Sequence, residues 1–370
     1  MIRRYSAIGL LLLAVPATAS LYQPDEPNTV PVRADGVAEP LPFEDFRQRM
    51  LTLANVADPR PTADGKPNRD RAAVLARVQA FQKKRNPTMD ELAVHGADLL
   101  RLGNDPPPGD PGFYVDKAVN LLAPHTRDRN LNYFLLTTLA EVHLARGETR
   151  EAIAVHDSAL IDAEMPATVK GWSEPQRKWI KKLDDEYVPH YLHIRLAEKE
   201  SLANPDREEP TPLFPLPAKN QPADPVRFVN DAGEYQVGSL EAAQRAKLPP
   251  DAIAVTQQLL LWFPSDTRLY WLLAELYAAD GKLAEANEVF FQCTWSKKYG
   301  NRRILMEHRH AVEKAVEDRR RAEEQAALDA YPVSLRMIWV YFGAVVLIAA
   351  VAFLRGRRGK TGGPHACCGG

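Results

Sequence analysis

One stretch of the sequence occurs twice. Residues 139–160 read LAEVHLARGETREAIAVHDSAL, and residues 273–294 read LAELYAADGKLAEANEVFFQCT. Both copies begin with Leu-Ala-Glu, and they share a glycine and an alanine at equal distances from that start: Gly147 and Ala152, Gly281 and Ala286. An internal repeat of this kind sets the architecture, because each copy forms one unit that buries its apolar face against its neighbours.

The duplicated stretch resembles the tetratricopeptide repeat, a helix-turn-helix unit of about 34 residues. The resemblance rests on bulky, small and aromatic residues at the positions where that repeat packs its two helices. The usual closing proline is replaced by Glu164 and Lys298. The residues that the resemblance assigns to packing are Leu139, Ala140, His143, Gly147, Ala152, His156 and Ala159 in the first copy, and Leu273, Ala274, Tyr277, Gly281, Ala286, Phe290 and Cys293 in the second.

The resemblance implies an all-α fold built as an irregular array of antiparallel helix pairs, an α-solenoid. Residues 92–123 look like a further, degraded unit, and the helices are expected either as two short arrays or as one irregular array. In such proteins the inner helices line a groove that binds polypeptides. The groove positions implied here are Phe134, Thr137, Glu141, Leu144, Arg268, Trp271 and Glu275.

Both ends of the chain predict a membrane location. Arg3 and Arg4, an apolar core and Ala17-Thr18-Ala19 are typical of a secretory signal peptide, the alternative being an uncleaved anchoring helix. Residues 337–354 form an uncharged apolar run that is long enough to cross a bilayer as a helix. The basic residues that follow it favour the cytoplasmic side. The bulk of the chain is therefore expected outside the cytosol, on a single-pass inner-membrane protein.

The pattern of prolines and apolar residues divides the chain into seven parts. We expect a hinge where prolines cluster and a β-hairpin where apolar residues alternate around Gly233. The predicted parts are a signal peptide (1–19), a flexible lead (20–40), an N-terminal repeat region (41–202), a proline-rich hinge with a β-hairpin (203–237), a C-terminal repeat region with a long charged helix (238–331), a transmembrane helix (337–354) and a basic cytoplasmic tail (355–370).

Composition and motifs limit the function. A formal net charge of -1 argues against nucleic-acid binding. Neither a phosphate-binding loop nor a nucleophile elbow is present. His190 and His193 have a spacing that can bind zinc, but no further ligand pattern accompanies them. We therefore predict no catalytic residue, no metal, no cofactor and no small-molecule substrate.

These observations favour a non-enzymatic, membrane-anchored adaptor or scaffold that presents a protein-binding groove. Two alternatives stay open. One is an assembly subunit that packs into a larger membrane complex through its transmembrane helix, and the other is a metal-dependent enzyme that uses His190 and His193. The sequence names no particular protein partner.

Overall fold

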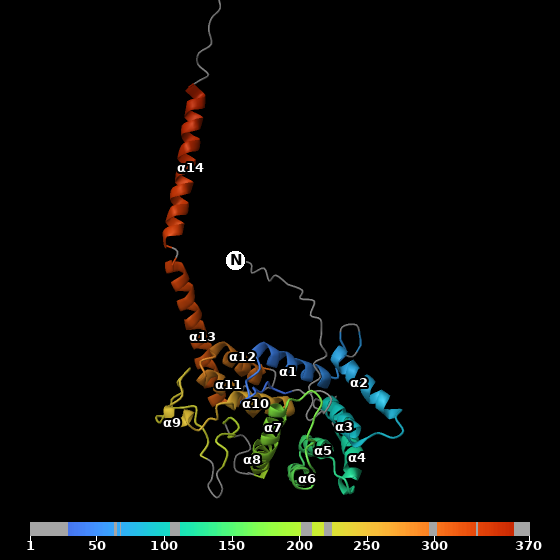
Figure 1. Ribbon diagram of the computed structural model, residues 1–370. Coiled ribbons are helices and arrows are strands. Elements are labelled where there is room, and N and C mark those ends of the chain that lie inside the picture. The colour runs from blue at the N-terminus through green and yellow to red at the C-terminus, as the bar shows by residue number, and fades with distance from the viewer. Residues whose placement is uncertain are drawn as a thin grey trace, which may run out of the picture. The chain divides into compact units, whose positions relative to one another are not determined.

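The fold is all-α within the part of the chain described by the structure, a computed structural model (Figure 1). The described residues are 29–62, 65–66, 68–103, 112–200, 209–217, 224–295, 302–330 and 332–358. The predicted signal peptide, the start of the lead and residues 359–370 lie outside them. The chain divides into one compact unit that ends at Val312 and a second that begins at Glu313. The helices before and after the proline-rich segment thus belong to one unit, as in the one-array alternative.

The first half of the compact unit is a succession of helices in which each packs on the next. They are α1 (Phe43–Ala57), α2 (Arg69–Gln82), α3 (Met89–Gly103), α4 (Phe113–Leu122), α5 (Tyr133–Ala145) and α6 (Thr149–Ile161). A capping box begins α3: Thr88 Oγ1 accepts the Glu91 N–H at 3.3 Å, and the Glu91 carboxylate accepts the Thr88 N–H at 2.9 Å. This reciprocal pair satisfies backbone donors that the first helical turn leaves open.

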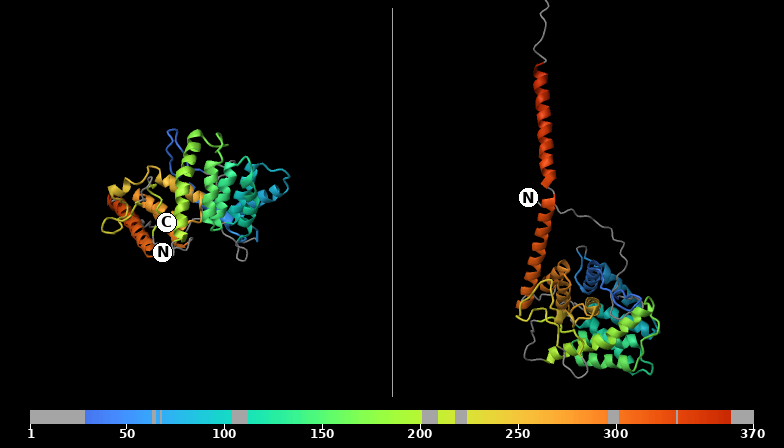
Figure 2. Two further views of the ribbon diagram at one scale, coloured as in Figure 1. Left: turned by 90° about the horizontal axis from the view of Figure 1, so that it is seen from below. Right: turned by 60° about the vertical axis from the view of Figure 1, so that its left-hand side comes forward.

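The second half of the unit returns to the first. Its helices are α7 (Glu174–Lys182), α8 (Val188–Glu200), α9 (Ala242–Arg245), α10 (Ala252–Trp262), α11 (Thr267–Ala279), α12 (Leu283–Trp295) and the start of α13 (Arg303–Ala330). Helix α8 packs on α6, and α10 packs on α1 despite the distance between them in sequence (Figure 2). These contacts close the unit.

The duplicated sequence forms two hairpins, α5–α6 and α11–α12, with the same turn. Gly147 and Gly281 adopt left-handed backbone angles, with φ of 75° and 74°. In the first turn the Glu148 N–H donates to the His143 carbonyl at 2.8 Å, and in the second the Lys282 N–H donates to the Tyr277 carbonyl at 2.9 Å. The equivalent glycines therefore end the first helix of each hairpin with the same turn.

Apart from His143 and the two exposed turn glycines, Gly147 and Gly281, the residues assigned to packing in the hairpins lie in the core in both copies. Ala152 and Ala286 are fully buried, so the helices approach closely where a larger side chain would hold them apart. His156 and Phe290 are buried at equivalent positions. His143 is partly buried, and its Nδ1 lies 2.7 Å from the Glu148 carboxylate.

The predicted flexible lead is wrong for its described residues. From Thr29 onward the chain packs against α10 as a strap, and two adjacent glutamines of α10 form hydrogen bonds with its backbone. Gln258 Oε1 accepts the Val30 N–H at 3.0 Å, and Gln257 binds both the N–H and the carbonyl of Leu41, at 2.7 and 3.1 Å. Val30 and Leu41 are buried. The side-chain amides supply the backbone partners that a sheet would otherwise provide.

The proline-rich segment predicted as a hinge is packed against the helices where the structure describes it. Residues 209–217 bury Leu213 and Phe214, and the Phe214 ring meets Tyr187 edge-on at 6.0 Å. Arg268 donates to the Glu209 and Pro210 carbonyls, at 2.9 and 3.2 Å, so this non-helical backbone is satisfied inside the protein.

The predicted β-hairpin is absent: residues 228–237 contain a turn and no strand. The turn is closed by the Asn230 N–H donating to the Glu234 carbonyl at 2.9 Å. The Asn230 side chain accepts the Glu234 N–H at 2.8 Å. Local side-chain hydrogen bonding of this kind shapes the backbone in place of strand pairing.

A π-helical turn, Leu183–Tyr187, separates α7 from α8. The Val188 N–H reaches back to the Leu183 carbonyl. Pro189 follows at once and has no N–H to offer the helix. The helix is therefore widened just before this proline, and the widened turn carries the buried Asp184.

Helix α14 (Pro332–Arg358) lies in the second unit and contains the predicted transmembrane segment. Its apolar side chains are largely exposed; Trp339, Leu347 and Ile348 are each about 70% exposed. No helix in the described part of the chain is long and apolar enough to cross a membrane. The predicted segment ends at Leu354, whose side chain lies outside the described part.

Replacement of Gly147 or Gly281 by alanine should lower the free energy of unfolding by about 1–2 kcal/mol, equally in both hairpins. A Cβ at either position meets no atom within 4 Å, so the loss comes from the left-handed backbone alone. Urea unfolding of each variant measures it. Gly147→Asn is the control and should lose less, because asparagine tolerates this conformation. Equal stability of the alanine variants and the wild type would contradict the assignment.

Candidate functional site

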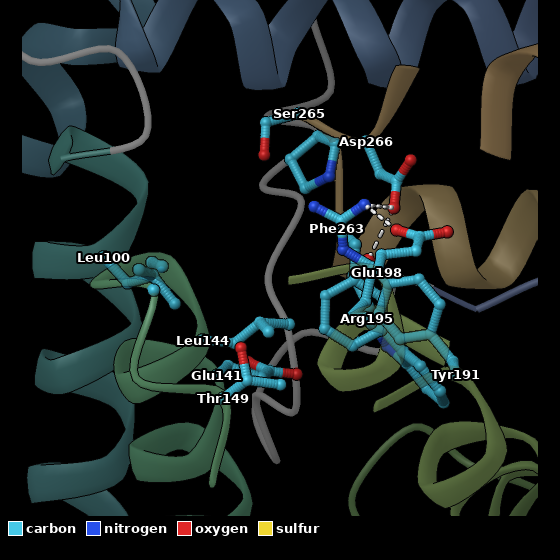
Figure 3. Close-up of a pocket in the computed structure, with 14 residues that line it drawn as sticks. Leu100, Glu141, Leu144, Thr149, Tyr191, Arg195, Glu198, Phe263, Ser265 and Asp266 are labelled. Carbon is cyan, nitrogen blue, oxygen red and sulfur yellow. Dashed lines mark hydrogen bonds and ion pairs between the residues drawn. The ribbon is translucent and has the colours of Figure 1, made fainter. Parts of the chain in front are cut away.

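A pocket of about 530 Å³ opens between the first hairpin and the second half of the compact unit (Figure 3). One wall comes from α3 and the α5–α6 hairpin, and the other from α8 and the α10–α11 loop. Its main lining residues are Leu100, Glu141, Leu144, Thr149, Tyr191, Arg195, Glu198, Phe263, Ser265 and Asp266.

The wall formed by α8 and the α10–α11 loop carries paired charges. Arg195 lies 2.8 Å from the Glu198 carboxylate and 3.7 Å from that of Asp266. Glu198 also pairs with Arg268. The Tyr191 hydroxyl donates to Asp266 at 2.7 Å, and burial, followed by the charge of Asp266, raises the pKa of Tyr191. Two arginines thus face two carboxylates, and this wall is close to neutral.

Glu141 lies on the opposite wall, beside Leu144 and Thr149 (Figure 3). Only 7% of it is exposed, and neither carboxyl oxygen has a hydrogen-bond partner. Burial, followed by the charge of Asp184, raises the pKa of Glu141 well above its ordinary value. Desolvation favours the neutral acid. The pocket therefore contains a carboxyl group whose neutral form is favoured and whose oxygens have no hydrogen-bond partner.

The second copy of the repeat shows why Glu141 is unpaired. The equivalent residue, Glu275, accepts hydrogen bonds from Trp271 Nε1 at 2.7 Å and His308 Nδ1 at 2.6 Å. In the first copy Thr137 stands in place of Trp271, and its hydroxyl bonds to the carbonyls of Tyr133 and Phe134. The substitution at this position thus removes one of the two donors, and the other, His308, lies on α13 outside the duplicated stretch.

Asp184 lies behind this wall in a fully buried polar cluster. It accepts hydrogen bonds from the Tyr133 hydroxyl and from His156 Nε2, the latter at 3.0 Å. Burial, followed by the charge of Asp184, raises the pKa of Tyr133 well above its usual range. All three side chains are closed off from solvent. The cluster therefore satisfies a buried carboxylate that no substrate can reach. His156 both packs in the hairpin and forms a hydrogen bond with Asp184.

Most of the predicted groove residues are not on a surface. Phe134, Thr137, Trp271 and Glu275 are buried, and Trp271 is 0% exposed. The reason is that α5 and α11 are covered on more than one side: α5 packs against α3, α4 and α6, and α11 against α10 and α12. Arg268 is mostly buried against Glu198 and the 209–217 backbone. Only Glu141 and Leu144 of the predicted set line the pocket.

The wall opposite Glu141 was not predicted. Tyr191, Arg195 and Asp266 lie outside the duplicated stretch, and no local motif connects them to it. The sequence did carry one signal for the pocket. The two copies keep their glutamate but differ four residues before it, where Thr137 of the first copy stands in place of Trp271, whose indole N–H can reach the glutamate.

His190 and His193 line a separate depression with Glu186, Leu216 and Pro217. Burial lowers the pKa of His190, which keeps it neutral at physiological pH. Among the residues placed by the structure, no group of three or more His, Cys, Asp or Glu is arranged to hold a metal ion. Cys293 is buried, and Cys367 and Cys368 lie outside the described residues.

No known protein family, curated protein or solved structure matches this chain. The fold itself defines the class of the protein, an all-α protein with two equivalent helical hairpins. Its relation to the tetratricopeptide repeat stays a resemblance carried by the duplicated residues.

Glu141→Gln should make the protein more stable relative to wild type as pH rises. Because the pKa of Glu141 is raised in the folded state, its stabilising contribution is complete below the unfolded-state pKa, about 4.3. Above that pH the contribution is lost progressively, by up to about 1.4 kcal/mol per pH unit until the folded pKa is reached. Urea unfolding at pH 5 and pH 8 measures the difference. The exposed Glu151→Gln on α6 is the matched control, and a difference for Glu141→Gln that is the same at both pH values would refute the explanation.

Proposed function

We propose that this protein is a membrane-tethered, non-enzymatic adaptor whose compact unit binds a segment of a partner protein in the Glu141 pocket. The observation that carries the proposal is the pocket itself, which lies between the first hairpin on one side and α8 with the α10–α11 loop on the other. Such concave sites between helices, with a few polar groups among apolar ones, are where helical proteins bind ligands. The unpaired Glu141 leaves hydrogen-bonding capacity for an incoming group.

Helix α14 is the proposed tether. The uncharged run 337–354 falls inside this helix. A membrane-spanning helix needs about 20 predominantly apolar residues, with a range of about 17–25. Exposed Trp339, Leu347 and Ile348 would be unfavourable in water and favourable in lipid. Arg355, Arg357 and Arg358 follow the run and favour a cytoplasmic end. Together with the predicted signal peptide, this pattern supports an extracytoplasmic compact unit.

A second candidate function rests on the same helix. If α14 packs against other transmembrane helices, the protein is an assembly subunit of a larger membrane complex. Gly343 on α14 supports this alternative, because a small residue lets two helices approach closely. The two candidates differ in which surface meets the partner: the pocket or α14.

Leu347→Arg with Ile348→Arg should release the protein from membranes washed with alkaline carbonate, whereas the wild type should stay in the pellet. Each arginine near the centre of a membrane helix costs about 3 kcal/mol. Leu328→Arg is the control, because Leu328 is also an exposed leucine but lies on α13, outside the apolar run. If the double variant stayed in the pellet as firmly as the control, the tether would be placed wrongly.

A photo-crosslinking amino acid in place of Leu144, in the native cell, should give a partner adduct that mass spectrometry identifies. The same amino acid in place of Ile161, which is 80% exposed on α6 and does not line the pocket, should not give that adduct. An adduct obtained only from a position on α14, such as Leu347, would favour the assembly subunit. Identical adducts from residues 144 and 161 would rule out recognition at the pocket.

A further inference from the structure

Among the described residues that carry the argument, the ionisable side chains around the pocket are paired with one another, except Glu141. Arg195 and Arg268 pair with Glu198 and Asp266 on the far wall. On the near wall Glu141 has no partner for either oxygen. A carboxyl group buried beside open space and without a donor is one that a ligand can complete.

Among the residues that the structure describes, the surroundings of Glu141 contain acceptors and no cation that pairs with it. From the π-helical turn comes the carboxylate of Asp184, which is already bonded to Tyr133 of α5 and His156 of α6. From α8 come Tyr191, Arg195 and Glu198, from the start of α11 Asp266, and from α6 the hydroxyl of Thr149. Arg195 is held by Glu198 and Asp266, so its charge is engaged.

We propose that the pocket binds one cationic group, the ammonium or guanidinium of a lysine or arginine side chain of the partner protein, which pairs with the Glu141 carboxylate. This deepens the proposed function and rests on it only for the source of the cation. An anion would be disfavoured by the charge of Asp184 behind Glu141, and it could not pair with Glu141 once that carboxyl group ionises. A purely apolar group would leave the carboxyl oxygens of Glu141 unsatisfied.

The shape of the pocket suits a long basic side chain. Leu100 and Leu144 on one side, and the stacked rings of Tyr191 and Phe263 on the other, provide apolar surface along the way to Glu141. The ring centroids of Tyr191 and Phe263 are 4.6 Å apart. Lysine and arginine bury an aliphatic stem against such surface while the charged head reaches a polar partner.

Binding should release a proton. Burial favours the protonated form of Glu141 in the empty pocket, since it raises the pKa of that carboxyl group. A cation that pairs with the carboxylate favours the ionised form, so the carboxyl proton passes to the buffer as the ion pair forms. The affinity for the cation should therefore increase with pH up to the pKa of Glu141 in the empty pocket.

Isothermal titration of the full chain in nonionic detergent at pH 7 tests this with Nα-acetyl-L-arginine amide and Nα-acetyl-L-lysine amide. Repetition in phosphate and Tris, which differ in ionisation enthalpy, measures the protons released. We expect up to one proton per bound cation with the wild type. Glu141→Gln should bind at least about 30-fold more weakly and release none, because a buried charge pair loses one partner.

Three controls isolate the cation and the carboxyl group. Nα-acetyl-L-citrulline amide has the shape of the arginine probe without its charge and should not bind. Glu275→Gln, the equivalent change in the second hairpin, should leave binding unchanged because Glu275 does not line the pocket. Leu144→Trp keeps Glu141 but fills the pocket and should abolish binding, and thermal melts show which variants remain folded.

The results separate this inference from the proposed function. Equal binding by the wild type and Glu141→Gln, equal binding of the citrulline probe, or no binding of either basic probe would overturn the inference. The adaptor function would still stand if the crosslinker at residue 144 captured a partner. Titration with spermidine tests whether the cation is instead a free polyamine. If spermidine bound more tightly than both capped amino acids, a protein side chain would be the wrong source of the cation.

Discussion

A carboxylate cannot stay charged in a protein interior without donors, and the polar groups of this core are arranged around that requirement. Asp184 is satisfied by Tyr133 and His156 from the first hairpin. Glu275 is satisfied by Trp271 and by His308 from the start of α13. Each carboxylate therefore joins separate helices, because its donors come from more than one of them. Glu141 alone among these carboxylates lacks such donors and faces a pocket instead.

The same need for partners joins segments that are far apart in the sequence. Gln257 and Gln258 are fully buried on α10, and their amides complete the backbone of the strap before α1. Arg268 does the same for the carbonyls of residues 209–217. The irregular segments are thus held by side chains of the helices rather than by one another. Contacts of this kind turn a row of helical hairpins into one closed unit, and they hold the α10–α11 loop across from the first hairpin.

The helices and the two equivalent turns could be predicted because their causes are local. Periodic apolar residues, the Thr88–Glu91 capping box and the glycines at 147 and 281 act within a few residues of chain. The strap and the 209–217 segment could not be predicted. Their proline-rich composition is typical of exposed loops, and their burial depends on Gln257, Gln258 and Arg268 far along the sequence. Pro189 lacks a backbone N–H and so marks a break in its helix, but it does not specify that the break takes the form of a π-helical turn.

The sequence by itself determined the all-α class, the positions of most helices and the equivalence of the two hairpins. The tertiary structure alone decided which faces of those helices meet other helices. Trp271 and Glu141 show the difference, because both occupy groove positions in the repeat. Packing of α10 and α12 on α11 buries Trp271 completely, whereas α8 and the α10–α11 loop stand back from α5 and leave a pocket at Glu141. Exposure of a helical residue depends on neighbours that are distant in sequence, and local periodicity carries no information about them.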